Sequence, residues 1–322
     1  MPLEKIISPI QVDLESVNSV IKKSLSSDIP IINQISSHII SSGGKRMRPI
    51  LHLLISGMTG EINEVNHKIA AIIEFIHTAT LLHDDVVDQS TKRRNMKTAN
   101  ALFGNAASVL VGDFIYSRSF QMMVGINNME IMEILSDTTN AISEGEVLQL
   151  LNSHNPNINE QQYFKVIQFK TAKLFEACGS LAGISNNNSS EEIILYSRLG
   201  LHFGIIFQLI DDILDYSGNA SQIGKNIGDD LSEGKITLPL IYAMKDSTKL
   251  QRNLIKDAIK VGDISRLPDV IEIIQETKSI SKVRIECEKQ LKDVKLILNK
   301  IPKNDFKKII LDLAEYSVYR KN

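Results

Sequence analysis

Cysteine is scarce in this chain, with only Cys178 and Cys287 among 322 residues. Two cysteines cannot build the disulfide framework of a small secreted domain, so we expect buried thiols and a reducing cytoplasm. Long apolar runs are also missing, because Glu74, His77 or Asp113 interrupts the longest ones before they reach membrane-spanning length. The first residues, MPLEKIISPIQVD, lack an apolar core and a cleavage-site pattern, and we expect no signal peptide there.

An excess of charge of one sign is absent too. The formal net charge is −2, with 23% charged and 43% hydrophobic residues. This balance provides no basic surface for nucleic acid, so we expect no nucleic-acid partner. The composition is that of a soluble globular protein, and the length permits one large domain or two small ones.

Proline and strand patterns are sparse, which favours helices. The eight prolines leave long spans rich in Leu, Ile, Ala, Glu and Lys. Apolar residues recur at three- and four-residue steps, a helical period. This pattern covers six segments: 64–90, 105–125, 129–151, 160–183, 191–215 and 270–299. No composition shift marks a linker, so we predict a single all-α domain over 1–322, a large bundle of about ten or more helices.

Two short acidic stretches echo each other, LLHDDVVD at 81–88 and QLIDDILD at 208–215. On a helix, residues four apart share a face. The first and third aspartates of each stretch therefore point the same way, Asp84 with Asp88 and Asp211 with Asp215. Like charges at this spacing repel each other and weaken an isolated helix.

The middle aspartates, Asp85 and Asp212, lie about 100° round the helix from the first. If the two trios face each other, their repulsion calls for cations. Oxygen ligands suit Mg²⁺, which combines carboxylates with waters and substrate phosphates. The alternative is that the aspartates form a solvated acidic patch. A solvated patch could explain a single trio, but it explains a second, matching trio less well.

Cationic segments lie near both trios, as a polyphosphate ligand would require. Arginine and lysine bind phosphate oxygens, and glycines let the backbone approach an anion. The segments are GGKRMRP at 43–49, TKRR at 91–94, FKTAK at 169–173 and GKNIGDDLSEGK at 224–235. Each alone is typical of a solvated surface, but their order along the chain favours a phosphate site.

These motifs, in this order and spacing over about residues 40–245, resemble the trans-isoprenyl diphosphate synthases. IEFIHTATLLHDDVVD and EGEVLQL are most similar to the bacterial octaprenyl diphosphate synthases. The resemblance implies an isoprenoid-synthase helical bundle with a central apolar cavity. It also implies Mg²⁺-dependent 1'-4 condensation of an allylic diphosphate with isopentenyl diphosphate, with three Mg²⁺ ions when the allylic diphosphate is bound.

The resemblance also assigns roles to residues. The implied metal ligands are Asp84, Asp88 and Asp211, joined by Asp85 and Asp215 and supported by Asp212. The implied contacts to the allylic substrate are Arg93, Lys170, Thr171, Gln208, Lys225 and Lys235. The implied contacts to the diphosphate of isopentenyl diphosphate are Lys45, Arg48, His77 and Arg94.

Small residues precede the first motif, and they set our expectation for product length. Ala79 and Thr80 stand where relatives with short products often carry a bulky aromatic residue, which predicts a long product. We expect octaprenyl diphosphate for quinone side chains, made from farnesyl diphosphate. We also expect a homodimer and transient membrane contact for product release. A geranyl, farnesyl or geranylgeranyl diphosphate synthase is the alternative.

Three other classes of protein share parts of this pattern. Glu64-x-x-His67 and Glu74-x-x-His77 have the spacing of a di-iron helical bundle, but that interpretation leaves the aspartates unexplained. A terpene cyclase shares the first aspartate motif but not QLIDDILD. A non-catalytic subunit would have lost aspartates that this chain keeps.

Two positions leave open questions. Asn95 follows the arginine pair where relatives usually have glycine, which puts the local turn in doubt. The last four residues, 319–322, include two basic side chains, and we expect them to be a frayed tail.

Overall fold

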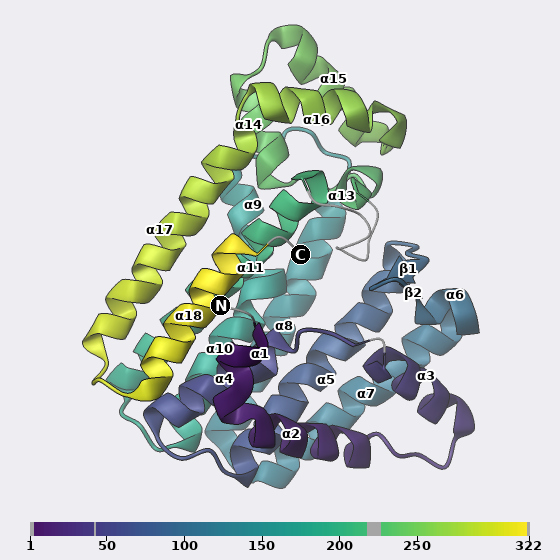
Figure 1. The fold of residues 1–322 in the computed structure, drawn as a ribbon. Coiled ribbons are helices and arrows are strands. Elements are labelled where there is room, and N and C mark those ends of the chain that lie inside the picture. The colour runs from purple at the N-terminus through teal and green to yellow at the C-terminus, as the bar shows by residue number, and fades with distance from the viewer. Residues whose placement is uncertain (1–2, 42, 218–226, 321–322) are drawn as a thin grey trace. The chain divides into compact units, whose positions relative to one another are not determined.

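The computed structural model describes residues 3–41, 43–217 and 227–320, and these are helical almost throughout (Figure 1). The chain divides into two compact units. Unit 1 comprises Met1–Thr139, Leu174–Gly200 and Ile301–Leu313, and unit 2 comprises Asn140–Lys173, Leu201–Lys300 and Ala314–Asn322. The all-α prediction is confirmed, whereas a single domain with a central apolar cavity stays a prediction.

The elements follow in chain order. They are α1 (Leu3–Ile7), η1 (Ser8–Ile10), α2 (Gln11–Ser24), α3 (Pro30–Ser41), α4 (Met47–Thr59), α5 (Glu64–Val87), β1 (Lys92–Arg93), β2 (Met96–Lys97), α6 (Ala99–Phe103), α7 (Asn105–Ile126), α8 (Met129–Asn152), α9 (Glu160–Ile167), η2 (Gln168–Ala172), α10 (Lys173–Ser185), α11 (Ser190–Ser217), α13 (Asp229–Ser232), α14 (Leu238–Asp246), α15 (Lys249–Val261), η3 (Ile264–Arg266), α16 (Leu267–Glu276), α17 (Ser279–Lys300) and α18 (Asp305–Tyr319). Helices α8, α10, α11 and α18 contribute residues to both units.

Helix α5 forms the core of unit 1, where it packs against α2, α4 and α7 (Figure 1). It begins at a capping box, in which the side chain of Asn63 accepts hydrogen bonds from the backbone N–H groups of Val65 and Asn66. Its apolar residues are buried on more than one face, which suits a central helix. The helix ends where Gln89 adopts a left-handed φ of 53°. The first aspartate motif thereby lies on its last turn.

Unit 2 has its own apolar cluster, made by the end of α11 and helices α13 to α16. Helix α15 begins at a capping box of Thr248 and Gln251 and ends at Gly262, whose φ is 66°. Its buried residues Ile255 and Ile259 face this cluster. The loop that carries Lys235 follows α13 and is therefore attached to a packed core.

One helix expected from the sequence is two helices in the structure. The segment 270–299 is interrupted between α16 and α17, where Lys278 has a left-handed φ of 54°. The hydroxyl of Thr277 donates to the backbone oxygen of Ile273 and lies 2.7 Å from the hydroxyl of Ser279. These side-chain bonds compete with the helical ladder, and apolar periodicity does not detect them.

Helix α11 has the length and apolarity of a membrane span, the only such helix in the described ranges. Half of its most apolar window is buried within the protein, and core helices of soluble proteins pass the same test. This helix also carries the second aspartate motif.

Candidate active site

The first aspartate motif divides its three carboxylates between two environments in unit 1. Asp84 and Asp88 are partly exposed on the last turn of α5, whereas Asp85 is only 1% exposed. Arg93 donates to Oδ1 of Asp85 from Nε at 2.9 Å and from Nη2 at 2.7 Å. The amide of Asn100 donates to the backbone oxygen of Asp85 at 3.0 Å. The middle aspartate therefore holds the segment that follows the helix, whereas the outer two are partly exposed.

A tight hairpin brings Arg93 to this position. Strands β1 and β2 pair antiparallel, with Lys92 opposite Lys97 and Arg93 opposite Met96. The two turn residues, Arg94 and Asn95, have φ values of 53° and 63°, as a type I′ turn requires. Asparagine tolerates this conformation better than most residues. The question about Asn95 is thus answered, because it takes the backbone shape that glycine would.

Three arginines surround His77 in the same unit. The pKa of His77 lies well below its ordinary value because of burial first, and then because of the positive charges of Arg48, Arg94 and Arg93. The ring is therefore neutral at physiological pH and adds hydrogen-bonding capacity without charge. Arg48 is itself 9% exposed, and its guanidinium lies 4.5 Å from the ring centre of Phe175. Guanidinium groups beside a neutral imidazole are suited to bind phosphate oxygens.

The glycine loop lies against Arg94. A Cβ atom built on Gly44 would come within 2.6 Å of Nη1 of Arg94, and the φ of Gly44 is 154°. The backbone shape therefore favours glycine there, and a Cβ would displace the end of the Arg94 side chain. Lys45 follows directly and is partly buried. Of the predicted contacts to isopentenyl diphosphate, the structure brings Arg48, His77 and Arg94 together and places Lys45 on the adjoining loop.

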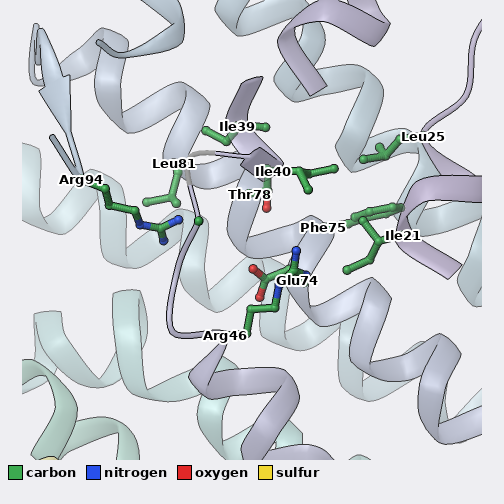
Figure 2. Close-up of a pocket in the computed structure, with 11 residues that line it drawn as sticks. Ile21, Leu25, Ile39, Ile40, Arg46, Glu74, Phe75, Thr78, Leu81 and Arg94 are labelled. Atoms are coloured by element: carbon green, nitrogen blue, oxygen red, sulfur yellow. The ribbon is translucent and has the colours of Figure 1, made fainter. Parts of the chain in front are cut away.

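A pocket borders this cluster within unit 1. Figure 2 shows Arg94 near Leu81 on one side of the pocket, and Arg46 beside Glu74 of α5. The pKa of Arg94 is lowered by burial, and the negative charge of Glu74 opposes that shift. The remaining lining residues are Ile21, Leu25, Ile39, Ile40, Gly43, Phe75, Thr78 and Leu81.

The second aspartate motif lies on α11 in unit 2, where each carboxylate has a different partner. Asp211 forms an ion pair with Arg320, whose guanidinium also stacks 4.4 Å from the ring centre of Phe207. Oδ2 of Asp215 accepts a hydrogen bond from the backbone N–H of Asp230 at 3.3 Å. The expectation of a frayed tail is wrong for Arg320, which is 8% exposed.

Asp212, the middle carboxylate, is 2% exposed and has donors on both oxygens. Tyr163 donates its hydroxyl proton to Oδ2 at 2.5 Å, and Nε2 of Gln208 donates to Oδ1 at 2.7 Å. Burial raises the pKa of Asp212, and the charge of Asp230 raises it further. The hydroxyl of Thr171 donates to Oε1 of Gln208 at 2.9 Å, which completes a chain of four side chains.

The FKT segment forms a π-helical turn, η2, within unit 2. Such turns widen a helix locally and are frequent at functional sites. Gly145 of α8 allows its close approach, because a Cβ there would lie 2.5 Å from the backbone nitrogen of Lys170. Nζ of Lys170 lies 2.5 Å from Oε2 of Glu146.

Of the two remaining predicted lysines, Lys225 lies outside the described residues. Lys235 lies 2.6 Å from Glu233, and its backbone N–H donates to the oxygen of Asp230 at 2.8 Å. The contact to Asp230 ties the loop of Lys235 to the segment that also binds Asp215.

Sequence reasoning missed several residues of these networks, namely Glu74, Asn100, Glu146, Tyr163 and Arg320. Glu146 belongs to the EGEVLQL stretch, so the sequence resemblance could have identified it. Tyr163 gives no such signal, because a tyrosine at an apolar helix position is typical of an ordinary core.

Known proteins resemble this chain along its whole length. The polyprenyl synthetase family model matches residues 29–276. The octaprenyl diphosphate synthase of Escherichia coli (strain K12) is 45% identical over 321 residues, 99% of each chain. The chain belongs to the polyprenyl synthetase family. The all-trans-nonaprenyl-diphosphate synthase (geranyl-diphosphate specific) of Rhodobacter capsulatus is 40% identical over 98% of each chain.

A solved polyprenyl synthetase structure matches the fold. It is a polyprenyl synthase from Caulobacter crescentus CB15 complexed with calcium and isoprenyl diphosphate. The TM-score is 0.96 at 37% identity, covering 100% of this chain and 98% of that one. The resemblance drawn from the motifs is thus confirmed at the level of family and fold.

Magnesium fits the donor set of this polyprenyl synthetase. The carboxylates are hard oxygen ligands, and Oδ2 of Asp85 is buried without a hydrogen-bond partner among the described residues. Within those residues, no three His, Cys, Asp or Glu side chains form a complete site. A partial shell is what Mg²⁺ accepts when waters and substrate phosphates supply its other ligands.

The di-iron alternative finds no support in unit 1. Nε2 of His67 lies 2.8 Å from Oδ1 of Asp13, and His77 lies among arginines whose charge would repel a metal cation. The histidines of the two Glu-x-x-His pairs therefore serve other contacts in this family member.

Proposed function

We propose that this polyprenyl synthetase joins an allylic prenyl diphosphate to isopentenyl diphosphate by repeated head-to-tail, 1'-4 condensation. The observation that carries the proposal is the cluster of Arg48, His77 and Arg94 beside the Gly44 loop. Two guanidinium groups, a neutral imidazole and a glycine loop are suited to bind the diphosphate of a small substrate.

The chain's residues divide the chemistry between them. Lys45, Arg48, His77 and Arg94 would hold the diphosphate of isopentenyl diphosphate and orient its double bond. Asp84, Asp88 and Asp211 would hold magnesium, joined by Asp85 and Asp215. Magnesium, when bound, supplies positive charge that stabilises the departing diphosphate of the allylic substrate.

The carbocation left on the allylic substrate needs partial negative charge nearby. We assign this role to the backbone oxygen of Lys170, the hydroxyl oxygen of Thr171 and the amide oxygen of Gln208. Arg93, Lys225 and Lys235 would contact the allylic substrate. The bond between the two substrates then forms, and the released diphosphate accepts the proton that is lost, so no protein base is assigned.

The preferred metal is magnesium, with three ions bound alongside the allylic diphosphate. The calcium in the Caulobacter crescentus structure supports dependence on a divalent cation. The oxygen-only donor set favours Mg²⁺ over softer metals.

The product is octaprenyl diphosphate, made from farnesyl diphosphate and used for quinone side chains. Ala79 lies on α5 close to Asp84 and is 1% exposed. The hydroxyl of Thr80 donates to the backbone oxygen of His77 at 2.9 Å and so turns back onto its own helix. Small side chains there would leave room for a growing chain. The Escherichia coli relative supports the octaprenyl product, while the Rhodobacter capsulatus relative marks nonaprenyl as the nearest competitor.

The enzyme works as a cytoplasmic homodimer that contacts membranes briefly to release its product. Helix α7 supports the dimer because large apolar side chains are exposed along it. Leu110 is 67% exposed and Val124 is 65% exposed, and Met129 at the start of α8 is 79% exposed. Apolar patches of this kind mark interaction surfaces.

One assay tests the proposal. Purified protein is incubated with farnesyl diphosphate and labelled isopentenyl diphosphate, with and without Mg²⁺, and the dephosphorylated products are separated by chromatography. We expect an octaprenyl product that disappears with a chelator. We also expect Ala79→Tyr to shorten it, since one helical turn rises about 5.4 Å, about one isoprene unit. No labelled product with Mg²⁺ present would refute the function, and an unshortened product would refute the placement of Ala79.

A further inference from the structure

A buried polar chain links three elements of unit 2 and includes one residue without an assigned role. Tyr163 of α9 bonds to Asp212 of α11, Asp212 to Gln208, and Gln208 to Thr171 of η2. Tyr163 is 4% exposed and Asp212 is 2% exposed. Buried polar networks of this kind favour one arrangement of their members when every group is satisfied.

The chemistry of the donors fixes the direction of this chain. Both oxygens of Asp212 accept, Oδ2 from the hydroxyl of Tyr163 and Oδ1 from Nε2 of Gln208. The amide nitrogen of Gln208 faces Asp212, because it is the donor to Oδ1. Its oxygen Oε1 must then face the other way, where it accepts the proton of Thr171.

We propose that Tyr163 is a positioning residue for the condensation. It holds Asp212 in one orientation, and Asp212 in turn keeps the amide oxygen of Gln208, beside the hydroxyl of Thr171, directed at the allylic carbocation. The inference rests on the proposed function, because it gives a purpose to the oxygen that the function assigns to Gln208. A carbonyl dipole that is already oriented stabilises developing positive charge without reorganising during the reaction.

Removal of the hydroxyl isolates this role from packing. The ring of Tyr163 is buried and meets Phe164 edge to face, with centroids 5.4 Å apart. Tyr163→Phe keeps that ring and deletes only the donor to Asp212. Oδ2 of Asp212 is then a buried acceptor without this donor, and the amide of Gln208 loses its fixed orientation.

A matched control comes from the same unit. The hydroxyl of Tyr242 donates to Oε1 of Glu160 at 3.0 Å, outside the chain of Tyr163. Tyr242→Phe deletes an equivalent donor to a carboxylate, and it should leave kcat within about twofold of wild type, the ordinary error of additivity.

The test is a double-mutant cycle on the full-length enzyme with Mg²⁺, farnesyl diphosphate and isopentenyl diphosphate. We expect Tyr163→Phe to lower kcat about tenfold, the effect of losing one buried hydrogen bond. The KM for isopentenyl diphosphate should stay within about twofold, because the residues assigned to that substrate are elsewhere. In a Gln208→Ala background, Tyr163→Phe should cost less than about twofold.

Binding of a cation mimic provides a second measurement. A prenyl ammonium analogue, with inorganic diphosphate, imitates the carbocation and its leaving group. We expect Tyr163→Phe to weaken the analogue about tenfold and farnesyl diphosphate by less than about twofold. Asp212→Asn should show the same selectivity, and it serves if Tyr163→Phe fails to fold in a thermal scan.

The outcomes separate this inference from the function. A wild-type enzyme without condensation overturns both. An active wild type in which Tyr163→Phe keeps full kcat overturns the inference alone. The inference is also overturned if the losses in kcat from Tyr163→Phe and Gln208→Ala are fully additive. It is overturned as well if Tyr163→Phe weakens the ammonium analogue and farnesyl diphosphate equally. A purely structural tyrosine would produce either result.

Discussion

Gly145→Ala should disable the π-helical turn that carries Lys170 and Thr171. A Cβ atom at this position would lie 2.5 Å from the backbone nitrogen of Lys170 and 2.9 Å from its Cα. Both neighbours are main-chain atoms, so no side chain can rotate out of the way. Ordinary contact between such atoms begins about 1 Å farther out, and the two backbones must separate by that amount.

The size of the effect follows from that displacement. A misplacement of about 1 Å at a catalytic group costs about 100-fold in rate. Overpacking of a closely fitted interior costs about 1–3 kcal/mol of stability. For a chain of this length, each kcal/mol lowers Tm by about 2 °C, so a fall of about 2–6 °C is expected. The enzyme should thus remain folded at assay temperature while its kcat collapses.

The assay compares steady-state kcat and KM for isopentenyl diphosphate with a thermal unfolding scan. Gly125→Ala is the matched control, since Gly125 is also helical and no atom outside its own helix lies within 4 Å of a Cβ built there. Alanine at an exposed helical position should stabilise by about 0.5–1 kcal/mol and leave kcat unchanged.

Two results would refute the reasoning. If Gly145→Ala keeps wild-type kcat with an unchanged Tm, the contact between α8 and η2 is looser than the structure indicates. If kcat and Tm of Gly145→Ala match those of Gly125→Ala and only the KM for isopentenyl diphosphate rises, the π-helical turn contacts isopentenyl diphosphate and not the allylic substrate.

Three further outcomes are expected. Gly44→Ala should push the guanidinium of Arg94 aside and raise the KM for isopentenyl diphosphate about tenfold with little change in kcat, measured by initial rates; a lower kcat at unchanged KM would contradict this. Arg320→Ala removes the cation paired with Asp211, so Mn²⁺ should bind about two- to fivefold more tightly. The Kd is measured by titration with Mn²⁺, monitored by electron paramagnetic resonance. Weaker binding of Mn²⁺ would show that Arg320 assists metal binding. Burial lowers the pKa of His52 from 6.5 to about 4, so the unfolded chain binds the extra proton between these values. The free energy of unfolding should therefore fall by about 2 kcal/mol as the pH drops from 7.5 to 5, and urea denaturation of His52→Gln should lack this part of the fall.

The sequence predicts the helices of this protein well because their causes are local. Apolar spacing marks α5, and Asn63 caps its start within three residues. The break at Lys278 escapes prediction because it depends on side-chain bonds around Thr277 that periodicity does not register. The hairpin of Arg94 and Asn95 was foreseen only as a doubtful turn, since neither residue is the glycine usually needed for positive φ.

The candidate site was predictable where charge and spacing reveal it. Both aspartate motifs are visible as charged residues after apolar stretches, and the arginines near His77 are visible as basic segments, GGKRMRP and TKRR. Partners of buried carboxylates are not visible in this way. Arg320 lies 109 residues after Asp211, and Tyr163 lies 49 residues before Asp212. Only the folded chain brings such distant residues together, so no local pattern could pair them.

The two aspartate motifs are nearly identical in sequence, but the partners of their middle aspartates differ. The middle carboxylate of each motif is buried, Asp85 against Arg93 and Asp212 against Tyr163 and Gln208. An arginine compensates a full negative charge, whereas neutral donors do so only in part, which agrees with the raised pKa of Asp212. Asp85 thus fixes the hairpin that carries Arg93, and Asp212 fixes the side-chain amide of Gln208. The repeat Asp-Asp-x-x-Asp therefore combines a buried anchor with an i,i+4 pair on one face. We expect that pair to provide the main metal ligands, joined in the first motif by Asp85.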